Sequence, residues 1–185
     1  SYKNMAGQDI AGTVSYSISG IPEKYTAPAN EEISIRKLVA QLKSGIHKLI
    51  AVCDNDTIER EIVLFSLSDK MPVVKTHDWF YQTASAFPKD GKPVYVQVGS
   101  SDTDTHILYS ILSGNKVLKH GTIDLSNEVK TLEYRYKEEY GSGILVTFAH
   151  VKEGRFYEHA VHIMKPYPDK KLHLKWATFR NRLIE

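Results

Sequence analysis

Three side chains near the C-terminal end of the sequence have the types that bind metals or transfer protons: Glu158, His159 and His162. Two histidines three or four residues apart bind zinc when they stand on a helix, because that spacing puts both rings on one face. In a strand, residues three apart point to opposite sides of the sheet, so the same pair cannot readily share an ion. Glu158 also precedes both histidines, which is the wrong order for the zinc-protease motif. The secondary structure of this stretch therefore decides which chemistry is available.

The residues around these histidines alternate with a period of two. Tyr157, Val161 and Ile163 are aromatic or β-branched, they share one side of an extended chain with His159, and Pro166 ends the run. This composition and periodicity predict a strand. We therefore expect strand histidines at a surface or an interface, not a metal site.

The rest of the sequence offers no constellation that would make an enzyme. It contains no Ser-His-Asp arrangement with supporting context, no glycine-rich phosphate loop and no pair of carboxylates in a plausible cleft. We predict no catalytic, cofactor-binding or metal-binding residues and no cofactor, and we expect the chain not to be an enzyme.

The only cysteine, Cys53, has two interpretations. It ends a predicted strand on which Leu49 and Ala51 share its face, and no basic neighbour is evident that would lower its pKa. A small buried hydrophobic side chain is therefore favoured over a reactive thiol. A single cysteine forms no internal disulfide, which is compatible with a reducing compartment or with a bacterial exported protein that lacks bridges.

Three other clusters also allow a functional and a structural interpretation. The aromatic run at residues 79–81 would line a glycan or peptide groove if it were exposed, but we expect it to divide between a core and the seam with a neighbouring module. Asp102 and Asp104 suit calcium weakly and are more typical of a solvated turn. The run Lys-Glu-Glu-Tyr at residues 137–140 is predicted to be a charged loop edge.

Composition limits the possible partners. The 185 residues carry a formal net charge of +2, with acids and bases interleaved, and this does not favour nucleic acid. No apolar run approaches the ~20 residues of a membrane-spanning helix, so no direct membrane insertion is predicted. The opening "SYKNMAGQD" has neither a start methionine nor an apolar stretch, and we expect a segment of a longer protein.

The strongest structural signal is the alternation between residues 75 and 166. Val94, Val96 and Val98 form one predicted inward row. Turn sequences such as Ser-Gly-Asn at 113–115 separate the strands. Seven short strands with this spacing are typical of an immunoglobulin-like sandwich, and we predict one complete domain over 75–166. The seven predicted strands are 79–84, 93–99, 106–112, 116–123, 129–136, 144–151 and 155–164.

The flanking regions predict parts of two more domains. "GTVSYSISG", "IHKLIAVCDND" and "TIEREIVLFSL" read as strands, the last two joined by a turn at 54–56. Periodicity leaves residues 33–42 open between a short strand and a helical turn. We predict an incomplete sandwich over 1–70, and a linker with the first strand of a following domain over 167–185. The predicted fold class is all-β, with tandem immunoglobulin-like antiparallel sandwiches.

Several stretches resemble the bacterial α-2-macroglobulin family, whose members are large envelope proteins built from tandem seven-stranded macroglobulin domains. These stretches are "YKNMAGQDIAGTVSYSI", "LKSGIHKLIAVCDN", "HDWFYQ", "LSNEVKTLEYRYKEEYGSGILVTFAHVKEGRFY" and "PDKKLHLKWATFRNRL". The resemblance covers most of the chain and is strongest from Asn127 to Leu183. It implies that the predicted sandwiches are of the macroglobulin type.

The resemblance also implies a role in trapping proteases. In the family, cleavage of a bait segment triggers a conformational change that encloses or covalently captures the protease, and capture uses a thioester within Cys-Gly-Glu-Gln. Here Cys53 is followed by Asp54-Asn55-Asp56, so that thioester cannot form, and no segment reads as bait. The implied role is scaffold in a protease inhibitor of the bacterial cell envelope (periplasm or outer membrane). Its partners would be neighbouring macroglobulin domains and the target proteases of the full-length protein. The alternative is a cell-surface binding or adhesion module that recognises glycan or protein.

Overall fold

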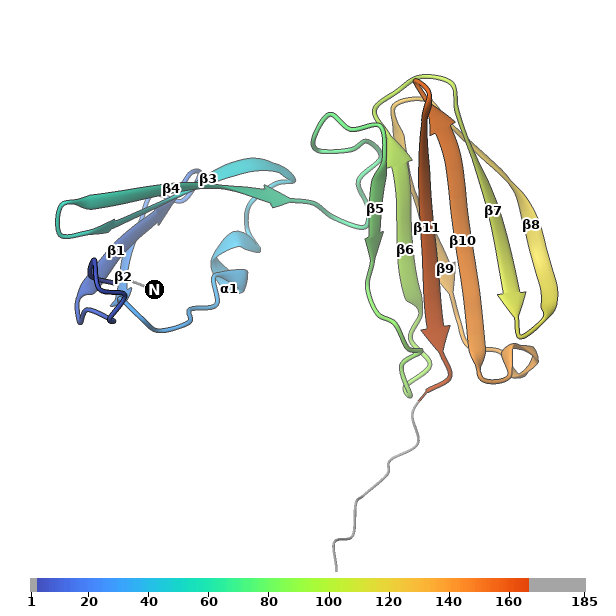
Figure 1. Cartoon of the computed structure of the whole chain (residues 1–185), viewed down its shortest axis with the longest axis horizontal. Coiled ribbons are helices and arrows are strands. Elements are labelled where there is room, and N and C mark those ends of the chain that lie inside the picture. Colours follow the sequence, from blue (N-terminus) through green and yellow to red (C-terminus); the bar gives the residue numbers. More distant parts are fainter. Residues whose placement is uncertain (1–2, 167–185) are drawn as a thin grey trace, which may run out of the picture.

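The computed structural model describes residues 3–166, which form three antiparallel sheets, so the predicted 167–185 linker and strand lie outside the described residues. One four-stranded sheet has the order β2-β1-β3-β4. The other two sheets, β11-β10-β7-β8 and β5-β6-β9, belong to the second half of the chain, and Figure 1 shows them facing each other as a sandwich. The predicted all-β fold class is confirmed at this level.

The first sheet contains the strands that alternation predicted and one that it missed. Strands β1 (Thr13–Ile18), β3 (Gly45–Cys53) and β4 (Asp56–Leu64) were all predicted, and β2 (Lys24–Pro28) was not. β2 is short and ends on a proline at an edge of the sheet, where a missing backbone donor is tolerated. The undecided segment contains the single helical turn α1 (Arg36–Val39).

This sheet is a single layer in the described part of the chain. The side chains it buries most deeply are Tyr16, Ile18, Ile21 and Cys53. Other apolar side chains of its strands stay exposed, among them Ile46 and Ile58. A two-sheet sandwich over 1–70 therefore remains a prediction.

All seven predicted strands of the second half are present. They are β5 (Trp79–Gln82), β6 (Val94–Ser100), β7 (Thr105–Ser113), β8 (Lys116–Leu125), β9 (Glu128–Tyr134), β10 (Gly143–Lys152) and β11 (Arg155–Met164). The predicted inward row Val94, Val96 and Val98 is buried to 2 % exposure or less. Burying a valine or phenylalanine side chain stabilises a fold by roughly 1.5–3 kcal/mol, so a shared core holds the two sheets together. Its buried members are Phe87, Val94, Val96, Val98, Ile107, Ile123, Leu125, Tyr134, Tyr140, Ile144, Val146, Phe148, Val161 and Ile163.

The chain that follows β5 leaves the sheet β5-β6-β9 and bonds to the other sheet of the sandwich, at β11. Phe87 N donates to Met164 O at 2.9 Å, and Met164 N donates to Ser85 O at 3.0 Å. Ala86 and Met164 form a parallel bridge at the end of β11. The segment 85–87, which follows the first strand of the sandwich, is therefore hydrogen bonded to the end of its last strand.

The prediction of a charged loop edge at 137–140 is wrong for one residue. Residues 138–140 form a short 3₁₀ helix, and Tyr140 is 7 % exposed. Its ring packs against Phe87 and Tyr136, with centroids 5.9 and 6.4 Å away. A tyrosine beside three charged residues looks solvated in sequence, but burial of its ring in the core is the larger stabilising effect. Within residues 3–166, no helix has the length and apolar character needed to cross a membrane.

Candidate functional site

The segment that joins β4 to β5, residues 65–78, is bonded along β9. Val129 N donates to Lys70 O at 2.8 Å, and Thr131 Oγ1 donates to Leu67 O at 2.7 Å. We call residues 65–78 the connecting segment. Most connections between elements are mobile surface loops, whereas this one has fixed hydrogen bonds to a strand of the sandwich.

The connecting segment is also bonded toward the first sheet. Ser44, which immediately precedes β3, donates through Oγ to Asp69 Oδ1 at 2.9 Å. The other oxygen of the same carboxylate, Oδ2, accepts from Ser66 N at 2.7 Å. Asp69 therefore links the start of β3 to the connecting segment, and the segment has hydrogen-bond partners on both sides.

The contact between the connecting segment and the sheet β5-β6-β9 is called the seam, and Gln97 is its central polar group. It lies on β6, it is 1 % exposed, and all of its amide groups have partners. Its Nε2 donates to Ser66 O at 2.9 Å and to Thr131 Oγ1 at 3.1 Å, and its Oε1 accepts from Trp79 Nε1 at 3.2 Å. A buried amide with every hydrogen bond satisfied fixes the geometry of the groups around it, because any displacement leaves a polar atom without a partner.

The aromatic run at 79–81 divides between the core and the seam. Phe65 packs edge-on against Trp79 and Tyr81, with centroid distances of 5.1 and 4.7 Å. Phe80 faces the other way and stacks on His159 at 4.0 Å. The rings of Trp79 and Tyr81 are thus in contact with Phe65 of the connecting segment, and Tyr81 stays 38 % exposed.

The last residues of the connecting segment are held by a histidine and a carboxylate. His77 Nδ1 lies 2.7 Å from Asp102 Oδ2, which also accepts from Ser100 Oγ at 3.2 Å. The hydrogen bond from His77 lowers the pKa of the Asp102 carboxyl, and that from Ser100 acts in the same direction. Asp102 therefore stays ionised, and its partner is a histidine of the connecting segment.

A second histidine–carboxylate pair involves His159 on β11. His159 Nε2 lies 2.6 Å from Asp78 Oδ2, while His150 Nε2 donates to His77 O at 3.1 Å. His162 is exposed on the other face of β11. The two histidines therefore point to opposite sides, as predicted for a strand. Within residues 3–166, no three histidine, cysteine, aspartate or glutamate side chains are grouped closely enough to hold a metal.

The remaining candidates have structural partners. Asp104 Oδ1 lies 3.1 Å from His106 Nε2, and His106 Nδ1 lies 2.6 Å from Asp124 Oδ1. The hydrogen bond to Asp124 raises the pKa of His106. Cys53 is 7 % exposed, and burial, followed by the charges of Asp54 and Asp56, raises the pKa of its thiol. A raised pKa disfavours the reactive thiolate.

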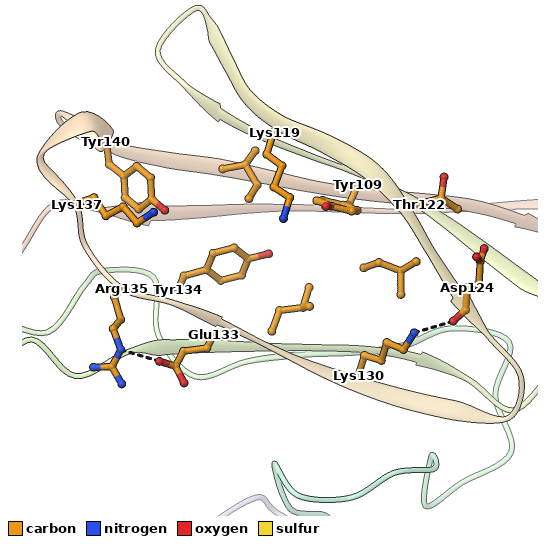
Figure 2. A pocket seen from close by; sticks show the side chains of 13 residues that line it. Tyr109, Lys119, Thr122, Asp124, Lys130, Glu133, Tyr134, Arg135, Lys137 and Tyr140 are labelled. Carbon is orange, nitrogen blue, oxygen red and sulfur yellow. Dashed lines mark hydrogen bonds and ion pairs between the residues drawn. The ribbon is translucent and has the colours of Figure 1, made fainter.

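The sandwich also has a lateral pocket of about 670 Å³ between β8 and β9. Figure 2 shows tyrosine and lysine side chains directed into it from both sides. We call this the lateral pocket. Its lining residues are Tyr109, Ile111, Lys119, Thr122, Ile123, Asp124, Lys130, Leu132, Glu133, Tyr134, Arg135, Lys137 and Tyr140.

Sequence reasoning missed Gln97 and the lateral pocket. Gln97 sits between Val96 and Val98 at an outward position, and alternation assigns such a position to solvent. Its burial depends on a segment that crosses the sheet from outside, and no local pattern encodes that crossing. The pocket depends on which two strands end their sheets, which is a property of topology. The chain matches no protein-family model, and no curated protein matches it.

Proposed function

We propose that the chain is a structural segment of a bacterial α-2-macroglobulin-like protease inhibitor, located in the cell envelope, and that it is not itself an enzyme. The observation that carries this proposal is the connecting segment, which is bonded to β9 through Lys70 and Leu67 and to the start of β3 through Asp69. A scaffold that relays a cleavage event as rigid-body motion needs such fixed junctions between its parts. A flexible linker would absorb the motion.

The sizes of the two sheets support the immunoglobulin-like, macroglobulin-type detail of this proposal. The sheets β5-β6-β9 and β11-β10-β7-β8 divide seven antiparallel strands into three and four. Seven-stranded immunoglobulin-like sandwiches also divide into sheets of four and three strands, but there the fourth strand joins the sheet of the first, second and fifth strands, whereas β8 joins the other sheet here. In this proposal the partners are neighbouring macroglobulin domains and the proteases that the full-length protein captures. Tandem sandwiches over 1–70 and 75–166 are part of the same proposal.

The scaffold role has a direct test on the chain of 185 residues. Rotational correlation times from ¹⁵N relaxation should be equal for the first sheet and for the sandwich, because the connecting segment couples them. Markedly shorter times for the first sheet than for the sandwich would show independent tumbling and remove the mechanical basis of the proposal.

The inhibitor role is tested on the full-length protein that contains this segment. A protease enclosed by it should keep its activity on a small chromogenic peptide and lose most of its activity on a large protein substrate. A matched protein with Gln97→Leu should trap less protease, because the seam is weakened while all other residues stay in place. Equal loss of activity on both substrates, or none on either, would contradict trapping by enclosure.

A further inference from the structure

The lateral pocket lies where the sandwich is open. β8 is the last strand of one sheet and β9 the last strand of the other, and within residues 3–166 neither pairs with a further strand on its outer side. Charged residues on such edges commonly prevent unwanted strand pairing. That role accounts for the lysines on β8 but gives no reason for the phenol hydroxyls that face the pocket behind them.

Two tyrosines with buried rings place their hydroxyl groups at the open space of the pocket. Tyr134 and Tyr140 are each 7 % exposed, but among the described residues only Thr105 Oγ1 is a fully buried side-chain polar atom without a partner, so the two phenol oxygens border the pocket and are not sealed in the core. Figure 2 shows the hydroxyl of Tyr134 directed into the pocket, toward the side from which Lys119 and Tyr109 enter it. Burial, together with the neighbouring hydroxyls of Tyr109 and Tyr140, raises the pKa of Tyr134. The phenol therefore stays protonated and is available as a donor.

The charge of the pocket is positive. Lys119 Nζ lies 5.9 Å from the centre of the Tyr109 ring, and among residues 3–166 no carboxylate lies within 4 Å of it. The two carboxylates of the lining have other partners. Glu133 pairs with Arg135 at 2.6 Å, and Asp124 lies 2.6 Å from His106. Lys119 is thus a cation with no carboxylate within 4 Å among the described residues, and it lies beside phenol hydroxyls that can donate hydrogen bonds.

The wall of the pocket is shaped by one glycine. A Cβ atom at Gly121 on β8 would lie 3.0 Å from Cε1 and 3.2 Å from Oη of Tyr109. The Tyr109 ring therefore lies directly over the backbone of β8, in space that any other residue would fill. This close approach keeps a third tyrosine on the pocket wall.

We propose that the lateral pocket binds an extended acidic peptide, with one carboxylate of the peptide accepting hydrogen bonds from the hydroxyl of Tyr134 and from Lys119. Charge-assisted hydrogen bonds to a carboxylate are the strong ones, and the positive charge of the site matches an acidic ligand. A peptide fits better than a small anion, because the pocket is larger than one carboxylate and runs between two free strand edges whose backbone groups can pair with an added strand. This binding role goes beyond the proposed scaffold function and does not depend on it.

The test uses the whole chain and a labelled extended peptide of alternating glutamate and valine, followed by fluorescence anisotropy. We expect binding that weakens with added salt, as charge pairing requires. A matched peptide with glutamine in place of glutamate should bind at least about tenfold more weakly, which corresponds to about 1.4 kcal/mol. Glutarate should compete only at much higher concentration.

Three variants locate the site. Tyr134→Phe removes only the hydroxyl and Lys119→Gln only the charge, and each should weaken binding of the glutamate peptide at least about tenfold. Lys116→Gln, on the same strand but outside the pocket, should have little effect. The proposal is overturned if the glutamate peptide does not bind, if the glutamine peptide binds equally well, if glutarate binds as tightly as the peptide, or if Lys116→Gln weakens binding as much as the other two. Lys119 is exposed, so its variant stays informative if Tyr134→Phe impairs folding.

Discussion

Replacing Gln97 by leucine tests the physical basis of the seam. The two side chains are similar in size, so the change removes three hydrogen bonds without opening a large cavity: those to Ser66 O, Thr131 Oγ1 and Trp79 Nε1. A hydrogen bond contributes about 1 kcal/mol net to stability. We therefore expect Gln97→Leu to lower the free energy of unfolding by about 3 kcal/mol. Water reaching the exposed Ser66 would reduce this loss somewhat.

Two measurements separate a general loss of stability from release of the connecting segment. Urea unfolding gives the free energy of unfolding, and limited trypsin digestion reports on cleavage after Lys70 and Lys75, both within the segment. Each 1.4 kcal/mol of local destabilisation should speed cleavage about tenfold where cleavage follows the open population. The control is Gln82→Leu on the neighbouring strand β5, whose effect should stay within about 0.5 kcal/mol. The stabilising role of the Gln97 hydrogen bonds would be refuted by two results together. Gln97→Leu would lower the free energy of unfolding no more than Gln82→Leu does, and trypsin would cleave the variant no faster than the unmodified chain.

Three more predictions follow from single residues. Gly143 has φ 141°, and a Cβ there would lie 2.5 Å from Ile163 O, so Gly143→Ala should lower the free energy of unfolding, measured by thermal unfolding, by about 3 kcal/mol. The control Gly114→Ala, with open space around the added Cβ, should cost roughly 1–2 kcal/mol. Equal losses for the two variants would contradict the clash. Because Asp124 raises the pKa of His106 above 6.5, their pairing stabilises the fold fully below pH 6.5 and the contribution is lost as the pH rises through the folded pKa; an NMR titration should give His106 a lower pKa in Asp124→Asn, and an unchanged value would contradict the pairing. Cys53, with its raised thiol pKa, should react with a thiol reagent more slowly in the folded than in the urea-unfolded chain, and equal rates would argue against its burial.

Much of the fold could be predicted because alternation records which side of a strand is buried. Val94, Val96 and Val98 could be assigned inward from sequence, and His159 and His162 could be separated onto opposite faces. β2 was missed because a short edge strand needs no continuous apolar side. Tyr140 was missed because its neighbours in sequence are charged, while its ring packs against residues far along the chain.

The contact between the aromatic run and the connecting segment could be predicted only in part, and the lateral pocket not at all, for a different physical reason. The aromatic run at 79–81 predicted a seam. Its contacts with Phe65 and with the amide of Gln97 form only when the sheets have formed. The lateral pocket needs β8 and β9 to end opposite sheets, and residues from both strands then share one space. Such long-range pairings depend on tertiary packing, which a local pattern does not contain.

The parallel bridge between Ala86 and Met164 has a mechanical consequence. Residues 85–87 follow the first strand of the sandwich, and Met164 ends the last one, so tension applied to the two ends of this half of the chain would load these hydrogen bonds once the pairing of β5 with β6 had given way. Because the two segments run in the same direction, the pull would slide them past each other lengthwise instead of opening them one bond at a time. Rupture would require the bonds at Ser85 and Phe87 to fail together, so we expect the sandwich to yield at higher force than a hairpin peeled from its end.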